Sequence, residues 1–350
     1  MIRLIVHAGA LKTASTFLRF RFFPNLDDCL YLGKNEDGEL IPEEINTLYK
    51  KIFPAFFQKT TPIGFRAQNS ALLLPALAKQ IIHELKKSGK NNVVISNETL
   101  FDFADYNAEA NQLLLHRLHA QLKTEYDGEV ELKVFMTIRN QNDFLKSFYT
   151  YFYQRFYRQF PSFRDFLSYG LANPMQTVFG QLHYDALLRD LESLFGADNV
   201  RFFVYEQMQE DSKKYLQDIL DFMGSKANLD QIDYQQKVNV NSNEAGHGIK
   251  RSEYKGLSIL GRLTDLIEKV YQVQQHRLKS LKNIPLIYGL WNRLLSVRRN
   301  SKTIVIKGRI KQIPDDLLPG LQSLYSKSNE ALAERLGIDL AKYGYWTSSK

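Results

Sequence analysis

A lysine and three hydroxyl side chains follow an apolar stretch near the start of the sequence. The apolar residues 2–6 lead to Gly9, Lys12 and then the hydroxyl residues Thr13, Ser15 and Thr16. A lysine charge, hydroxyl donors and the free backbone N–H groups at a helix start together bind phosphate-like anions. An ordinary strand–helix turn needs only one hydroxyl as its N-cap, so this cluster favours an anion site.

Such a site needs a strand that ends at the loop and a helix that begins after it. The sequence predicts buried strands at 2–8, 91–96, 130–138 and 199–206, and helices at 71–89, 107–124 and 143–160. Strands that alternate with helices indicate a parallel sheet covered on both faces. We therefore predict an α/β fold with a parallel β-sheet flanked by helices. Residues 1–225 are the expected α/β core, and 226–350 a mostly helical C-terminal extension packed on it.

The loop differs from the phosphate-binding loop of enzymes that cleave ATP or GTP. That loop has the pattern Gly-x-x-x-x-Gly-Lys-Ser/Thr. Here Leu11 stands where the second glycine belongs, and Gly9 lies only three residues before Lys12. A nucleotide kinase with an unusual loop is therefore an alternative, but not the leading one.

A second group of polar residues follows the predicted strand 130–138. Arg139 comes directly after the strand, and Ser147 lies on the helix that follows. An arginine at the carboxyl end of a strand can bind a phosphate with two parallel hydrogen bonds, and a helix serine can add a third. This second polar group can thus bind a phosphate as well.

These two segments resemble the nucleotide-binding motifs of sulfotransferases that use 3′-phosphoadenosine 5′-phosphosulfate (PAPS). Residues 9–16 resemble the loop that binds the 5′-phosphosulfate, with Ala14 in place of the usual glycine. Residues 139–149 resemble the segment that binds the 3′-phosphate, with Gln141 in place of proline. Weaker similarity at 200–224 and 238–252 extends the resemblance over roughly residues 2–252. The resemblance implies a sulfotransferase core related to P-loop nucleotide-binding folds.

The resemblance also implies roles for individual residues. PAPS would be the sulfuryl donor and adenosine 3′,5′-bisphosphate (PAP) the product. Lys12 would stabilise charge on the leaving group, and Arg139 with Ser147 would bind the 3′-phosphate. The remaining donor-binding residues would be Gly9, Thr13, Ala14, Ser15 and Thr16. We expect no metal ion, because a transferring sulfonate carries less charge than a phosphoryl group and the sequence has no clear metal-binding pattern.

A hydroxyl acceptor also needs a general base. Glu98 is the first candidate, because it follows the predicted strand 91–96 at the end where α/β sheets bind ligands. It can alternatively be a carboxylate that stabilises a helix start. His7, directly before the loop, is the second candidate. The other histidines left open are His116, His119, His183 and His247.

The acceptor is the least specified partner. Most rings of the aromatic stretch 148–160 are expected to pack in the core, but Tyr151, Arg155 and Arg158 are candidates for an acceptor cleft. A carbohydrate or glycan that accepts the sulfuryl group on a hydroxyl or an amine is the leading acceptor; a phenol, a lipid-linked precursor and a natural product stay open. A protein of this fold that binds a nucleotide or a glycan without catalysis is a further alternative.

The net charge, the cysteine count and the apolar segments of the sequence limit which ligands the protein can bind and where in the cell it is expected. The 350 residues carry a formal net charge of +8, which suits anionic ligands, and no nucleic-acid-binding motif is found. Cys29 is the single cysteine, so no intramolecular disulfide can form. Without a secretion signal or a run long enough to span a membrane, we expect a cytoplasmic enzyme. Residues 284–302 can be a packed helix or lie on an anionic membrane surface.

Overall fold

The computed structural model describes residues 1–34, 40–41, 45, 72–98, 100, 108–156, 159–232, 249–252, 303–306 and 312–348. The chain forms two compact units. The first contains Met1–Phe148, Ser162–Val240 and Gln312–Lys350, and the second Tyr149–Pro161 and Asn241–Lys311. The predicted boundary near residue 225 stays a prediction.

The first unit is built on a six-stranded sheet with the order β3-β2-β4-β1-β5-β6. The strands are β1 (Ile2–His7), β2 (Cys29–Lys34), β3 (Leu40–Ile41), β4 (Asn92–Ser96), β5 (Val130–Ile138) and β6 (Val200–Val204). Neighbours from β2 to β6 pair in parallel, and only the short edge strand β3 is antiparallel. The parallel sheet confirms the predicted α/β fold and adds β2, which the sequence analysis did not identify.

Strand β1 lies at the centre of the sheet, between β4 and β5. Val6 pairs with Ile95 of β4 on one side and with Val134 of β5 on the other. The chain leaves β1 towards β2 and later crosses over β1 to form β5, so the order of strands reverses here. Ligands of open α/β sheets bind beyond the carboxyl ends of the strands at such a reversal. The loops after β1, β4 and β5 meet at this place.

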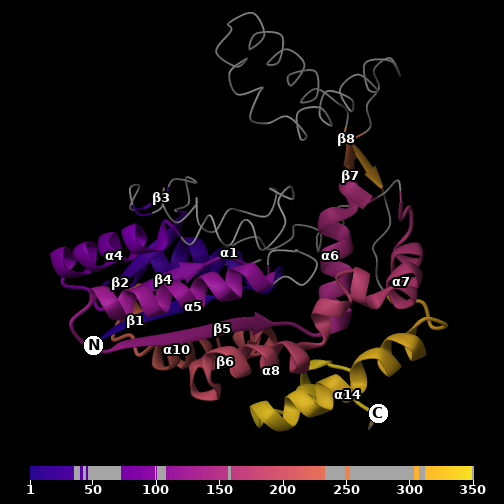
Figure 1. Ribbon diagram of the computed structural model, residues 1–350. Helices are drawn as coiled ribbons and strands as arrows, with labels where there is room; N and C mark the ends of the chain where they lie inside the picture. Colours follow the sequence, from indigo (N-terminus) through magenta and orange to yellow (C-terminus); the bar gives the residue numbers. More distant parts are fainter. Residues whose placement is uncertain are drawn as a thin grey trace, which may run out of the picture. The chain divides into compact units, whose positions relative to one another are not determined.

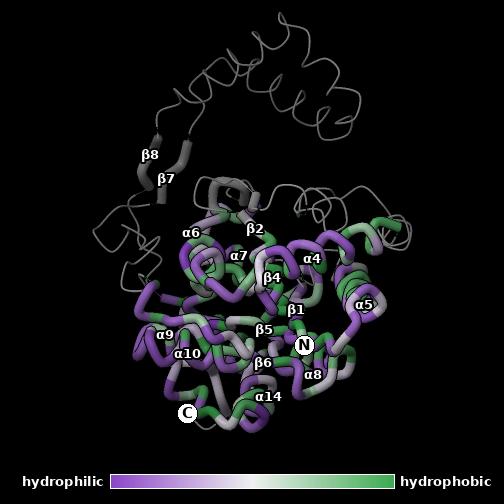
Figure 2. The backbone as a smooth tube through the Cα atoms, turned by 90° about the vertical axis from the view of Figure 1, so that its left-hand side faces the viewer, coloured by the Kyte–Doolittle hydropathy of each residue, from purple (hydrophilic) through white to green (hydrophobic). Residues whose placement is uncertain are grey.

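Helices cover both faces of the sheet. On one face, a cluster of buried side chains joins the sheet to α10 (Ser212–Met223) and to the segment that follows β1. That segment comprises α1 (Ser15–Phe17), the π-helical turn η1 (Leu18–Phe22) and the 3₁₀ turn η2 (Phe23–Asn25). On the other face lie α4 (Leu74–Ser88), α5 (Ala108–Glu125) and α8 (Tyr184–Phe195), as Figure 2 shows. Both faces of the parallel strands are therefore buried, as their apolar sequences require.

The remaining described helices extend this arrangement. They are α6 (Gln141–Phe156), α7 (Phe163–Ala172), the short α9 (Tyr205–Glu210) and the C-terminal α14 (Leu318–Leu336). Helix α14 packs beside α8 (Figure 1), and the Tyr325 hydroxyl donates a hydrogen bond of 3.0 Å to the carbonyl of Phe179. The C-terminal region is thus helical where the first unit includes it.

The described part of the second unit contains an antiparallel pair of strands. These are β7 (Ile249–Ser252) and β8 (Thr303–Ile306). The predicted membrane-surface segment 284–302 lies outside the described residues. Across the part of the chain that the structure describes, no helix combines the length and apolar character needed to span a bilayer.

Candidate active site

The loop after β1 packs tightly against the end of β4. Gly9 has a φ of 99°, and a Cβ atom added there would lie 2.4 Å from the backbone oxygen of Glu98. Any other residue would therefore clash or force the loop away from β4. Backbone hydrogen bonds from Ala8 to Phe135 and from Ala10 to Thr137 fix the loop to β5 as well. Gly9 thus allows the loop to sit between its two neighbouring strand ends.

The next part of the loop has an unusual backbone. Lys12 and Ala14 both have left-handed backbone angles, with φ of 66° and 59°. Glycine adopts this conformation most easily, which explains the usual glycine of the resembling motif at the position of Ala14. The methyl group of Ala14 packs against the buried cluster that includes Phe17. The chain therefore keeps the loop shape with alanine in place of glycine.

The three hydroxyl residues differ in their contacts. The buried Thr13 side chain donates a 2.6 Å hydrogen bond to the carbonyl of Ala10 and so braces the loop. Ser15 Oγ donates a 2.6 Å hydrogen bond to Glu98 Oε2. Thr16 is half-buried in α1. The predicted donor-binding loop and the predicted base are thus in direct contact.

Glu98 has a second partner that the sequence analysis missed. Arg19 Nη1 lies 3.3 Å from Glu98 Oε1, and both side chains are about a quarter exposed. Arg19 follows Ser15 by four residues, a spacing that places two side chains on one side of a helical segment. Ser15 and Arg19 hold the two carboxylate oxygens of Glu98 from one helical segment.

The charges of Glu98 and Arg139 act in opposite directions on the pKa of Lys12. Burial lowers the pKa of the Lys12 ammonium group, the Glu98 carboxylate opposes this change, and the Arg139 charge adds to it. Arg139 Nη1 also donates a 3.2 Å hydrogen bond to the backbone oxygen of Lys12. The two predicted anion-binding segments therefore touch, and two cations gather where the strand ends meet.

The start of α6 carries the second segment. The Arg139 guanidinium lies 5.1 Å from the ring centre of Tyr205 and 3.9 Å from Asp143 Oδ2. Ser147 follows on α6 and is half-buried. Arg139 is thus oriented by a ring and a carboxylate while its charge remains near Lys12.

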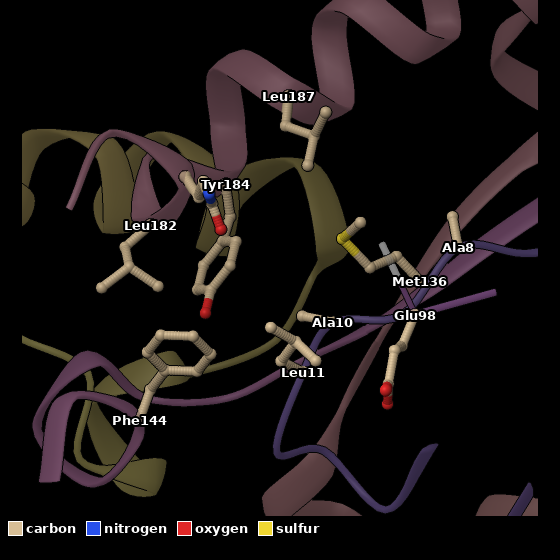
Figure 3. A pocket seen from close by; sticks show the side chains of 10 residues that line it. Ala8, Ala10, Leu11, Glu98, Met136, Phe144, Leu182, Tyr184 and Leu187 are labelled. Atoms are coloured by element: carbon tan, nitrogen blue, oxygen red, sulfur yellow. The ribbon is translucent and has the colours of Figure 1, made fainter. Parts of the chain in front are cut away.

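A pocket opens beside the loop on the face covered by α8. It contains about 380 Å³ of empty space, including its open mouth. Figure 3 shows Leu182, Tyr184 and Phe144 on one side and Ala8, Met136 and Glu98 on the other. The full lining is Ala8, Ala10, Leu11, Glu98, Met136, Phe144, Gln181, Leu182, Tyr184 and Leu187. Glu98 is the charged residue in this otherwise mainly apolar lining.

His7, the second candidate base, is completely buried at the end of β1. Its ring packs against Phe23 and Phe135, with ring centres 5.4 and 5.0 Å away, and Nδ1 lies 2.7 Å from Ser96 Oγ. Burial, with a smaller effect of the Arg19 charge, lowers the pKa of His7 to about 3. A ring enclosed in this way has no open path to an acceptor, which speaks against His7 as the base.

This burial leads to a prediction for acid stability. Between pH 6.5 and 3, the unfolded chain binds a proton at His7 that the folded protein excludes. The free energy of unfolding therefore falls with decreasing pH, by up to about 1.4 kcal/mol per pH unit from this group. We expect His7→Gln to flatten this decline in denaturant titrations at several pH values. The exposed His116 supplies the control His116→Gln, and parallel curves for His7→Gln and the wild type would contradict the prediction.

Among the residues that line this pocket, none of the other sequence candidates is found, and some of those candidates fall outside the described part of the chain. The exposed Tyr151 belongs to the second unit, and its ring meets Phe152 edge-on at 4.8 Å. Arg158 and His247 lie outside the described residues, and the structure does not describe the side chain of Arg155. His119 Nε2 lies 2.9 Å from the carbonyl oxygen of Val130. His183, next to the pocket residue Leu182, packs against Tyr325 at 5.2 Å.

No metal site is found among the described residues, where no group of three or more His, Cys, Asp or Glu side chains could hold an ion. The expectation of a metal-free reaction stays a prediction.

Known proteins that resemble this chain are sulfotransferases. The sulfotransferase domain family model matches residues 67–246, just over half of the chain; this range includes Glu98, Arg139 and Ser147 and begins after the loop 9–16. A sulfotransferase from Alicyclobacillus acidocaldarius is 13% identical, with a TM-score of 0.49 over 97% of this chain and 98% of that one. The sulfotransferase domain of the Synechococcus PCC 7002 olefin synthase is 14% identical, with a TM-score of 0.33 over 69% and 79%. No curated protein matches the sequence.

Proposed function

The chain belongs to the sulfotransferase domain family, and from this we propose that it transfers a sulfuryl group from PAPS to a hydroxyl group of an acceptor. The observation that carries the donor assignment is the contact between the two anion-binding segments. Arg139 Nη1 donates to the backbone oxygen of Lys12, which supports the proposal that the 5′- and 3′-phosphate groups of one donor bind at the carboxyl ends of β1 and β5. One nucleotide with phosphate groups at both positions fits this pair of segments.

Each residue has a task in the proposed reaction. An acceptor oxygen forms a bond to sulfur, the bond from sulfur to the bridging oxygen of the phosphosulfate breaks, and PAP leaves. Lys12 stabilises the negative charge that develops on that bridging oxygen. The backbone and hydroxyl groups of the loop 9–16 bind the 5′-phosphosulfate, and Arg139 and Ser147 bind the 3′-phosphate. Glu98 takes the proton of the acceptor hydroxyl.

The acceptor assignment rests on the pocket beside Glu98. A carbohydrate stays the first class to test, because the chain is basic and rich in aromatic residues. The mainly apolar described lining favours a second class, in which the hydroxyl belongs to a phenol or an alcohol with an apolar part. Sulfuryl transfer from radiolabelled PAPS to matched sets of saccharides and apolar alcohols separates these two classes.

The donor assignment predicts a strong preference for nucleotides that carry a 3′-phosphate. We expect PAP to bind more tightly than adenosine 5′-monophosphate by about 2 kcal/mol or more, because a charged, bidentate contact is lost without the 3′-phosphate. Arg139→Ala should remove most of this difference. Isothermal titration calorimetry with both nucleotides measures it, and Arg164→Ala, which breaks an exposed ion pair with Asp316, is the control.

Other results of these assays would favour the alternatives. Equal affinity of the wild type for the two nucleotides contradicts the PAPS assignment. A requirement for Mg²⁺ with ATP would favour a nucleotide kinase. PAP binding without sulfuryl transfer to any acceptor class would favour a protein that binds nucleotides without catalysis. The expected cytoplasmic location belongs to the proposal, and imaging of the tagged protein in cells tests it.

A further inference from the structure

We propose that the C-terminal helix α14 belongs to the nucleotide site, because Asn329 positions the 3′-phosphate segment through Gln141. Gln141 is the first residue of α6 and lies two residues after Arg139. Asn329 lies on α14, far away in the sequence. This inference rests on the proposed binding of the 3′-phosphate by Arg139 and Ser147, and it assigns a role to a region that neither motif includes.

The two residues form a reciprocal amide pair. Gln141 Nε2 donates a 2.7 Å hydrogen bond to Asn329 Oδ1, and Asn329 Nδ2 donates one of 3.1 Å to Gln141 Oε1. Each side chain is completely buried. Further bonds anchor the pair, from Gln141 to the Leu182 carbonyl at 3.3 Å and from Asn329 to the Trp346 carbonyl at 2.8 Å. A buried amide pair satisfied in this way is directional and rigid, because an alternative orientation leaves polar atoms unpaired.

Every residue of the segment 139–141 is held from a different element. The Tyr184 hydroxyl of α8 donates a 3.0 Å hydrogen bond to the carbonyl oxygen of Arg139. Glu206 Oε1 of α9 accepts from the backbone N–H and the side-chain amide of Asn140, at 3.0 and 2.8 Å. Asn329 supplies the third anchor, on Gln141. The segment therefore depends on long-range contacts for its shape.

The anchor on Gln141 acts where a proline stands in the motif that this segment resembles. A proline at the first position of a helix fixes the backbone by its own ring. Gln141 has no such restriction, and the amide pair provides it from outside through α14. Because the direction of α6 sets the relation of Ser147 to Arg139, loss of the pair loosens the 3′-phosphate contacts before those of the loop 9–16.

The test compares two nucleotides on one variant. For Asn329→Ala, we expect the affinity ratio of PAP to adenosine 5′-monophosphate to fall about tenfold, since misplaced binding groups lose their contact energy. Affinity for the 5′-monophosphate itself should change less than threefold. The ratio reports the 3′-phosphate contacts alone, so a loss of stability that leaves the folded site intact does not change it.

The same helix offers a matched control. Tyr325→Phe removes a different buried hydrogen bond of α14, the one to the Phe179 carbonyl, and leaves the ring in place. It should lower the thermal unfolding temperature without changing the nucleotide ratio. If Asn329→Ala does not fold, Gln141→Met breaks the same pair from the other side and should lower the ratio alike.

The outcomes separate this inference from the proposed function. A wild type without preference for PAP contradicts the proposed function. A wild type with that preference, and an Asn329→Ala or Gln141→Met variant that keeps it, contradicts only the positioning role. The positioning role would also be overturned if Tyr325→Phe lowered the affinity ratio of PAP to adenosine 5′-monophosphate as much as Asn329→Ala does. Any weakening of α14 would then have the same effect.

Discussion

Replacing Lys12 with alanine should lower turnover by about two to three orders of magnitude while the protein keeps its fold. A preorganised positive charge at the leaving oxygen acts mainly in the transition state, where the negative charge develops. The side chain lies in the loop after the carboxyl end of β1, where it is only half-buried. Alanine keeps a Cβ atom at the left-handed backbone position, so the substitution adds no new strain there.

The pH dependence of the wild type provides a second measurement of the same role. Burial lowers the pKa of Lys12, so the ammonium group loses its proton at a lower pH than an ordinary lysine. Because the charged form is the active one, kcat/KM for PAPS should fall on the alkaline side below the usual lysine pKa of about 10.4. Lys12→Arg, which stays charged, should shift this decline to higher pH.

A second lysine variant separates the effect of the Lys12 charge at the site from the effect of a lower net charge of the protein. Lys214→Ala also removes one positive charge, but Lys214 forms an exposed ion pair with Asp218 on α10. Its turnover should stay within about twofold of the wild type, since exposed pairs contribute little. Near-normal turnover of Lys12→Ala, measured with saturating PAPS, would remove Lys12 from the catalytic step.

Much of the sheet could be predicted from local patterns, because its central strands are mostly apolar and rich in β-branched residues. The helix that ends at Gly89 was also clear, and Gly89 indeed has a left-handed φ of 69°. Strand β2 was missed, because its apolar run, 29–32, is short, follows two aspartates and is followed by a glycine and a lysine. A run of four residues does not distinguish a strand from a loop.

The site could be predicted only in part, because many of its contacts join residues that are far apart in the sequence. The loop 9–16 and Arg139 could be identified because each polar group directly follows a strand. The contacts of Glu98 with Ser15 and Arg19 could not be predicted. They form because β1 and β4 are neighbours in the sheet, and the order of the strands cannot be read from local patterns. Gln141 and Asn329 are 188 positions apart, and no local pattern connects them.

Replacing Glu98 with glutamine should lower turnover by about 10²–10⁴-fold, the usual contribution of a general base. Glutamine has nearly the same size and can still accept the hydrogen bond of Ser15, but it cannot take a proton. Glu98 lines the pocket beside the loop, where an acceptor hydroxyl would approach the sulfur. PAP affinity should change little, because in this role Glu98 does not bind the nucleotide.

The contacts of Glu98 also define the competing explanation. Ser15 donates to one carboxylate oxygen and Arg19 pairs with the other, so Glu98 can also act by holding the donor-binding loop in shape. A residue that only shapes the loop would, when changed, weaken PAP binding. Arg19→Gln breaks the ion pair with Glu98 without removing the carboxylate or a group assigned to the donor, and it should therefore reproduce the effect of Glu98→Gln only if shaping is the whole role.

Turnover and PAP affinity measured together on three variants decide between the two roles. Glu98→Gln with low turnover and unchanged PAP affinity, beside an Arg19→Gln variant that stays within about tenfold of wild-type turnover, identifies Glu98 as the base. Glu131→Gln is the matched control: Glu131 pairs with Arg3 at 2.6 Å, its side chain is 32% exposed, and it lies near the opposite end of the sheet. Normal turnover of Glu98→Gln would exclude Glu98. The burial of His7 speaks against it as the next candidate, but a loss of turnover in His7→Gln at unchanged PAP affinity would assign the role to it. If both variants stay active, the base is another histidine, or the acceptor is an amine that is already deprotonated.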